Sequence, residues 1–331
     1  MKLIGRRQFL FASGALFAAP YPLFAQPSAG VRTIGVLSLA PESSMFGQWA
    51  RKALLDALRA TGHEEGRNLV VEWRWGSGKL EAMPALAADL VARKVEVIVA
   101  ILNDAIAPAI RATQTIPIVM MYASVPVEMG FIASLNRPGG NVTGTTYTDP
   151  ETSSKFLQFL KEARPSTSRV AILRNPAYPG MRSYGVVLDR IAPSLGIRLQ
   201  YFDVERAEDV PAALERMAAS RPDGFLFGQD PVVEPRIPEI VAFARKHKLP
   251  SIGSTGQWAN SGGLLTYSPE PQDLAERTAS YVDRILRGAK PADLPVEQPT
   301  KYQLVVNLQT AKTIDLTIPK SLLVRATRVI E

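Results

Sequence analysis

Short runs rich in β-branched residues alternate with longer amphipathic stretches along most of the chain. In the first half, the runs at residues 33–37, 68–73, 95–101 and 116–121 predict buried strands, and the stretches between them repeat apolar residues at helical spacing. Strands joined by helices of this length form right-handed βαβ units, in which helices cover both faces of a parallel sheet. The alternation therefore predicts an α/β fold.

The pattern occurs twice, roughly 130 residues apart, and this period is far too long for a solenoid. In the second half, strands are predicted at residues 169–173, 198–203, 223–227 and 250–252. Helices are predicted at residues 46–60, 80–93, 105–113, about 181–194, 207–219, 237–247, 271–287 and 308–314. Further strands are predicted at residues 142–147, 262–267 and 302–307. The length of 331 residues suits two domains. Three passages of chain between two similar lobes would form a hinge.

Residues 1–25 have the layout of a secretory signal peptide. A positive segment with Lys2, Arg6 and Arg7 precedes an apolar run at residues 9–17, which is too short to remain as a membrane anchor. The Arg pair followed by Gln8-Phe9-Leu10 resembles a twin-arginine export signal, and an ordinary Sec signal is the alternative. Either route predicts a mature protein that is exported to the periplasm and soluble.

The composition excludes several classes of site. The chain has no cysteine and only two histidines, His63 and His247, so thiolate zinc sites, cysteine nucleophiles and multi-histidine metal centres are excluded. The net charge is +7, but residues 1–25 hold three basic and no acidic residues, so the mature chain carries +4. Much of the basic charge therefore belongs to the export signal, and we expect no nucleic-acid partner.

No motif points to catalysis or to a cofactor. The segment Gly76-Ser77-Gly78-Lys79 lacks the full spacing of a phosphate-binding loop, and no G-x-S-x-G motif is present. His63 and His247 are both expected on the surface, and no pair of carboxylates stands out. We therefore expect no catalytic residue, no metal ligand and no cofactor.

Polar residues follow successive predicted strands, at the sheet edge where ligands bind in parallel α/β folds. Hydroxyl and amide groups there, together with the free N–H groups of helix N-termini, could hold a ligand carboxylate, and Asp104 or Asp230 could meet a ligand amine. The alternative is that these residues are helix N-caps, which need the same residue types. The candidate ligand-binding residues are Ser38, Ser43, Ser44, Asn103, Asp104, Tyr122, Ser124, Tyr147, Asn175, Tyr178, Gln229, Asp230, Ser254 and Thr255.

Several segments of the mature chain carry a more specific pattern. The most specific is ASLNRPGGNVTG at residues 133–144. The others are residues 33–38, 66–68, 84–91, 115–119, 291–301 and 318–319. In these segments the chain resembles the solute-binding proteins of bacterial ABC transporters, in the branch of tryptophan- and tyrosine-type substrate-binding proteins.

The resemblance implies a type I periplasmic-binding fold, with two Rossmann-like lobes, parallel sheets, a three-segment hinge and a ligand between the lobes. We expect residues 31–146 with about 267–300 in lobe 1, and residues 147–266 with about 301–331 in lobe 2. The resemblance also implies that hinge closure captures a small polar solute, an amino acid or a related carboxylate. An ABC permease and an ATPase are the implied partners, and we expect a monomer.

Two alternatives share the same lobes: the solute-binding component of a sensor or chemoreceptor system, and an exported enzyme on a similar bilobal fold. The chain also departs from the family pattern in two loops. It has Asn103-Asp104-Ala105 where the family often has Gly-Thr/Ser-Pro-Ala, and Ser124-Val125-Pro126 where the family often has Gly-Asp-Pro. Because the family's Asp is missing there, the resemblance does not fix the identity of the solute.

Overall fold

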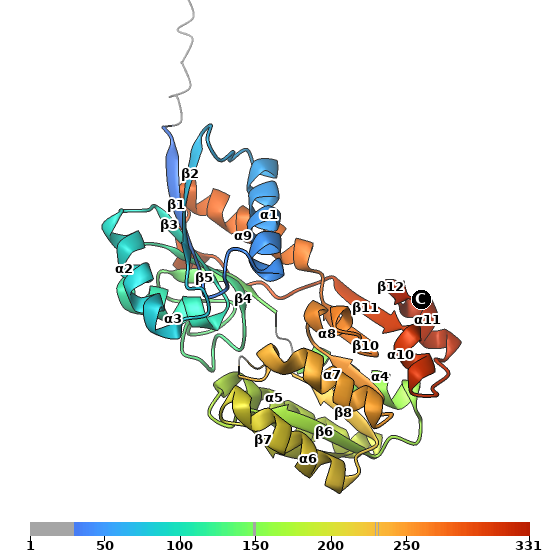
Figure 1. Ribbon diagram of the computed structural model, residues 1–331. Helices are drawn as coiled ribbons and strands as arrows, with labels where there is room; N and C mark the ends of the chain where they lie inside the picture. Colours follow the sequence, from blue (N-terminus) through green and yellow to red (C-terminus); the bar gives the residue numbers. More distant parts are fainter. Residues whose placement is uncertain (1–29, 148–149, 229, 231) are drawn as a thin grey trace, which may run out of the picture.

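The protein has two α/β lobes, each built around one sheet (Figure 1). The computed structural model describes residues 30–147, 150–228, 230 and 232–331. The predicted signal peptide lies outside the described residues, as does Gln229. Within the described ranges, no helix is long and apolar enough to cross a membrane.

Lobe 1 is centred on a parallel five-stranded sheet with the strand order β2-β1-β3-β4-β5. All five residues of the central strand β3 are buried. Val97, Val99 and Ile101 face the helices α1 and α9, whereas Ile98 and Ala100 face α2 and α3. The elements of the first half are β1 (Arg32–Ser38), α1 (Met45–Ala60), β2 (Leu69–Trp75), η1 (Leu80–Ala82), α2 (Met83–Ala92), β3 (Val97–Ile101), α3 (Asn103–Ala112), β4 (Ile118–Ala123) and β5 (Val142–Thr146).

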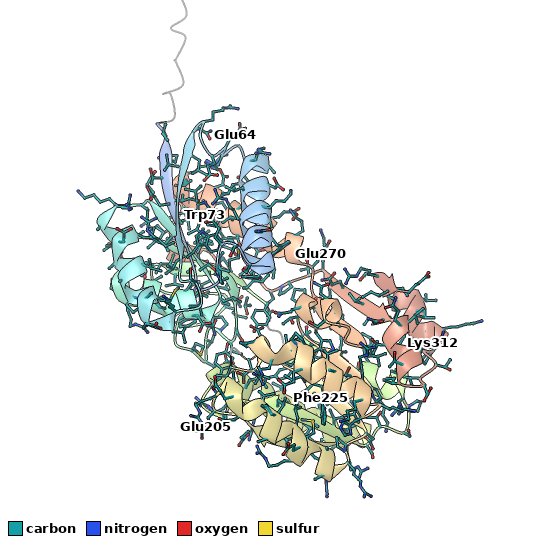
Figure 2. The ribbon with its side chains drawn as sticks, in the orientation of Figure 1. Glu64, Trp73, Glu205, Phe225, Glu270 and Lys312 are labelled. Carbon is teal, nitrogen blue, oxygen red and sulfur yellow. The ribbon has the colours of Figure 1, made fainter. Side chains whose placement is uncertain are left out.

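Lobe 2 is centred on a seven-stranded sheet with the order β12-β11-β10-β9-β8-β6-β7. One core cluster includes α4, α5 and α11 on one face of this sheet, and another includes α6, α7 and α8 on the other. Phe225 lies inside this lobe, whereas Glu205 and Lys312 point away from it (Figure 2). The elements are α4 (Pro150–Ala163), β6 (Arg169–Arg174), α5 (Pro179–Ile191), η2 (Ala192–Leu195), β7 (Arg198–Asp203), η3 (Ala207–Asp209), α6 (Val210–Ser220), β8 (Gly224–Phe227), η4 (Glu234–Arg236), α7 (Ile237–Lys246), β9 (Ser251–Gly253), α8 (Gly256–Asn260), β10 (Leu265–Pro269), β11 (Tyr302–Asn307), α10 (Leu308–Thr313), α11 (Lys320–Arg325) and β12 (Arg328–Ile330).

The two-lobed α/β fold with largely parallel sheets is confirmed, and one strand pair departs from it. Strands β10 and β11 are antiparallel, with Pro269 opposite Tyr302. Between them the chain visits lobe 1, where it forms α9 (Pro271–Leu286) and η5 (Pro291–Asp293). Strand β10 runs toward the crossing and β11 starts from it, so the two strands must point in opposite directions.

The three passages between the lobes lie side by side and are hydrogen-bonded to one another. The first follows β5, the second joins β10 to α9, and the third joins η5 to β11 (Figure 1). The backbone N–H of Thr146 donates to the carbonyl of Glu297 at 3.0 Å, and that of Glu270 donates to the carbonyl of Lys301 at 2.9 Å. Glu270, which is labelled in Figure 2, lies in the second passage.

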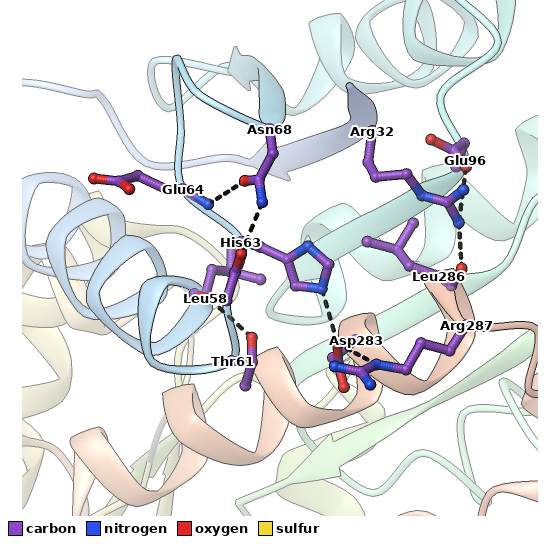
Figure 3. A network of polar contacts seen from close by, with 11 residues as sticks. Arg32, Leu58, Thr61, His63, Glu64, Asn68, Glu96, Asp283, Leu286 and Arg287 are labelled. Carbon is purple, nitrogen blue, oxygen red and sulfur yellow. Dashed lines mark hydrogen bonds and ion pairs between the residues drawn. The ribbon is translucent and has the colours of Figure 1, made fainter. Parts of the chain in front are cut away.

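A polar network attaches the returning helix α9 to lobe 1 (Figure 3). The His63 ring nitrogen Nε2 lies 2.9 Å from Asp283 Oδ1, and Arg287 Nε donates to the same oxygen at 2.8 Å. Arg32 pairs with Glu96 and donates to the carbonyl of Leu286. Only 14 % of the His63 side chain is exposed, so the prediction of a surface histidine is wrong there. His247 is exposed, as predicted.

Replacing Asp283 with Ala should lower the free energy of unfolding by about 1–3 kcal/mol, because the half-buried His63 ring loses its partner. Arg287→Ala is the matched control. Its side chain is 72 % exposed, so its loss should cost less than about 0.5 kcal/mol. Urea denaturation of both variants measures the difference, and equal costs would contradict a stabilising role for the His63 contact.

Candidate functional site

A small cavity lies between the lobes, at the carboxyl ends of several strands. From lobe 1 it is lined by Leu102, Asn103, Asp104, Tyr122 and Ser124, which follow or end β3 and β4. Tyr147 of the first passage, together with Tyr178 and Glu234 of lobe 2, completes the lining. The room inside is about 20 Å³, close to the space that one water molecule needs. An amino acid is larger than this space, so it could enter only if the walls of the cavity move apart.

The lobe 1 wall is held in a strained backbone conformation. Leu102 and Tyr122 have φ angles of 67° and 63°, in the left-handed region that non-glycine residues avoid. The β4–β5 register shifts between Met120 and Ala123, an irregularity of the kind that re-aims side chains at sheet edges. Backbone strain of this kind tends to be kept where function needs a fixed geometry.

Asn103 holds the two loops of this wall together. Its Nδ2 donates to the carbonyl of Ser124 at 3.0 Å, and its Oδ1 accepts from the backbone N–H of Ser124 at 2.9 Å. Both ends of the amide are thus used within the protein. Asn103 therefore positions its neighbours Asp104 and Ser124.

Two carboxyl groups face the cavity from opposite lobes. Asp104 lies in the first turn of α3 and Glu234 is the first residue of η4. Burial raises the pKa of Asp104. Burial also raises the pKa of Glu234 to about 7, and the charges of Asp104 and Asp230 add to this rise. Among the described residues, no group donates a hydrogen bond to either carboxyl.

Three tyrosines complete the walls of the cavity. Burial raises the pKa of Tyr122, Tyr147 and Tyr178, so all three phenols are neutral at physiological pH. The hydroxyl of Ser124 interacts with the phenols of Tyr147 and Tyr178, and this interaction partly offsets the rise. The Tyr122 ring packs edge-on against Trp49 of α1, with 5.8 Å between the ring centroids. The walls thus combine aromatic rings with acidic groups.

The structure brings only part of the predicted set to this cavity. The predicted residues that line it are Asn103, Asp104, Tyr122, Ser124, Tyr147 and Tyr178. The predicted residues of the described chain that do not line it are Ser38, Ser43, Ser44, Asn175, Asp230, Ser254 and Thr255. Ser44 is the N-cap of α1, since its Oγ accepts from the N–H of Gly47 at 3.0 Å. Asn175 Oδ1 accepts from the N–H of Ala177 at 2.9 Å in a local turn. For Ser44 and Asn175, the polar side chain therefore stabilises a helix N-terminus or a turn, which was the alternative to ligand binding.

Asp230 does not line the cavity, and its carboxylate instead binds backbone N–H groups of two loops. It is fully buried, and its carboxylate accepts from the N–H groups of Asn175 at 2.5 Å and Val232 at 3.0 Å. Burial raises its pKa, while these backbone hydrogen bonds oppose the rise. Asp230 thereby joins the loop after β6 to the loop after β8.

The acid that reaches the cavity from lobe 2 is Glu234, which the sequence analysis missed, as it missed Leu102. The N–H of Glu234 donates to the carbonyl of Asp230 at 2.8 Å, so Glu234 lies one helical turn further on. The sequence did contain a signal for Glu234, because it is an acid four residues after Asp230, which was itself a predicted site residue. Ser254 and Thr255 follow β9, and their buried hydroxyls have no partner in the part of the chain that the structure describes.

Asp230→Ala should lower the free energy of unfolding by about 1–3 kcal/mol, because two backbone N–H groups lose their acceptor. Asp203→Ala is the control, since Asp203 is half exposed and its ion pair with Arg174 should contribute less than about 1 kcal/mol. Thermal and urea unfolding measure both values. A fully stable Asp230→Ala protein would contradict this structural role.

Comparison with known proteins supports a common architecture. The family model described as ABC transporter substrate binding protein matches residues 34–330. A tyrosine-binding protein of Clostridioides difficile (strain R20291) is 24 % identical over 285 residues, which cover 86 % of this chain and 81 % of that protein.

Two solved structures have the same fold, each with a TM-score of 0.83 over 90 % of this chain and 99 % of the other. One is a conserved domain protein of Vibrio cholerae, which is 27 % identical to this chain. The other, 24 % identical, is an ABC domain from Streptococcus pneumoniae in complex with L-Trp. Since the family model spans nearly all of the described residues, the chain belongs to the family of ABC transporter substrate binding proteins.

Proposed function

We propose that this protein is the solute-binding component of an ABC importer, and that it captures one small polar solute between its lobes. The observation that carries the proposal is the cavity, whose walls come from both lobes and from the first passage between them. Neither lobe alone forms the site. The tyrosine-binding relative and the L-Trp complex favour an amino acid or a related molecule as the solute.

Capture would proceed by hinge closure. The solute first contacts the preformed lobe 1 wall, where Asn103 fixes the loops that carry Asp104 and Ser124. Closure then adds Tyr178 and Glu234 of lobe 2. A solute shifts the open–closed equilibrium only if it binds the closed form better, and contacts made by the second lobe supply this difference. The three hydrogen-bonded passages would act as the hinge.

The partners in this proposal are a membrane permease and a cytoplasmic ATPase, and the protein acts as a monomer in the periplasm. It performs no chemistry on the solute. Among the described residues, no group of three His, Asp or Glu side chains could hold a metal ion. The binding step would be the same for a sensor system, and neighbouring genes that encode a permease and an ATPase would support the importer.

The chain without residues 1–25 should bind a small solute and leave it unchanged. At a hundredfold excess over its Kd, such a solute stabilises the folded state by about 2.7 kcal/mol and raises the Tm by several degrees. A thermal-shift screen of amino acids, amines, small carboxylates and sugars, followed by mass analysis of the solute, measures both properties. Consumption of a substrate without any stabilising solute would instead support the exported-enzyme alternative.

A further inference from the structure

We propose that the solute carries a positive charge, an ammonium or a similar organic cation, and that this charge holds the cleft closed by lying between Asp104 of lobe 1 and Glu234 of lobe 2. The inference rests on the proposed function, because it concerns the same cavity. It specifies the class of solute, and it predicts that a solute carboxylate is dispensable.

The ionisable side chains that line the cavity are acidic. Among the described residues, its lining contains two carboxyl groups and no Lys, Arg or His. Three arginines are close in sequence to the lobe 2 lining, and their contacts lie outside the cavity. Arg236 pairs with Glu239 at 2.7 Å, although its buried Nε has no hydrogen-bond partner among the described residues. Arg174 pairs with Asp203 at 2.7 Å, and Arg182 donates to the carbonyls of Pro176 and Ala177 at 3.0 Å. A third acid, Asp230, contributes to the electrostatic environment of Glu234. The described lining residues therefore offer no cationic side chain to a solute carboxylate.

The two carboxyls differ from Asp230 in what surrounds them. Backbone N–H groups satisfy Asp230, whereas neither Asp104 nor Glu234 accepts a hydrogen bond within the described part of the chain. The groups that face Glu234 are Asp104 on α3, Asp230, and the phenols of Tyr147 and Tyr178. Both carboxyls are half-buried. Partial burial without a hydrogen-bond donor favours uptake of a proton or pairing with a cation.

The tyrosines of the same cavity suit an organic cation. Tyr122, Tyr147 and Tyr178 are neutral and line the space between the two acids. The π face of a tyrosine attracts a cation, and the attraction grows when water is excluded. The two acids would pair with the positive charge of the solute, and the tyrosine rings would contact its carbon skeleton. This combination matches an amine with an apolar or aromatic body.

The placement of one acid on each lobe couples this charge to closure. In a closed cleft without a cation, Asp104 and Glu234 repel each other or must be protonated. A cation contacts one acid while the lobes are apart and both once they close, so it binds the closed form better. An anionic solute of the same shape would add to the repulsion and oppose closure.

Matched solute series test the charge requirement. Calorimetric titrations at neutral pH would compare each amino acid with its decarboxylated amine and its deaminated acid, for example L-tyrosine, tyramine and 3-(4-hydroxyphenyl)propionate. In the series that binds, the amine should bind at least as tightly as the amino acid, and the acid at least tenfold more weakly.

The outcomes separate this inference from the proposed function. Binding of the amino acid or the acid, but not of the amine, would overturn the inference and leave the proposed function standing. If a neutral sugar bound and no amine did, the inference would also fail, although the protein would still be a solute-binding protein. If no solute of any class bound, both this inference and the proposed function would be wrong.

Variants identify the two acids. Asp104→Asn and Glu234→Gln keep the side-chain shape and should each weaken amine binding about tenfold or more, the range expected for a hydrogen bond to a charged group. They should also reduce the preference for amine over acid, which a merely structural role would leave unchanged. The exposed acids Glu81 and Glu215 provide controls, since Glu81→Gln and Glu215→Gln should bind like the original protein. An unchanged preference in both site variants would overturn the inference.

Discussion

The return of α9 to the first sheet is the packing interaction on which the two-lobed arrangement depends. Ala275, Ala279 and Val282 of this helix are buried in the same core cluster as the strands and α1 of lobe 1, although the helix follows the second half in sequence. The small alanines let the helix approach the sheet closely, and the His63–Asp283 contact ties it to the turn after α1. Because the chain must cross to reach this site and cross back, the lobes are joined by three adjacent passages.

The three passages between the lobes also determine where the cavity lies. Parallel strands in each lobe end toward the other lobe, so the loops after β3, β4 and β8 meet across one narrow space. The strained backbone at Leu102 and Tyr122 and the Asn103 amide fix one wall. The other wall supplies Tyr178 and Glu234. The lining of the cavity is thus divided between the two lobes.

Hydrophobic periodicity predicted most strands and helices because burial in a parallel sheet leaves a clear pattern, as in β3. It could not predict the antiparallel β10–β11 pair, since strand direction depends on where the chain goes between the two strands. The resemblance to solute-binding proteins is confirmed by the family model. His63 was misplaced because its partner, Asp283, is 220 residues away in sequence.

For the site, the sequence determined which residue types follow the strands, and six of the predicted positions line the cavity. It could not separate binding residues from caps and turns, because Ser44 and Asn175 are polar for local reasons that look the same in sequence. Only the tertiary structure decided that Asp230 points into backbone hydrogen bonds while Glu234 reaches the cavity. It also decided that Asp104 and Glu234 line the same cavity, because the distance between groups on different lobes depends on how the two lobes pack against each other, and local sequence does not encode it.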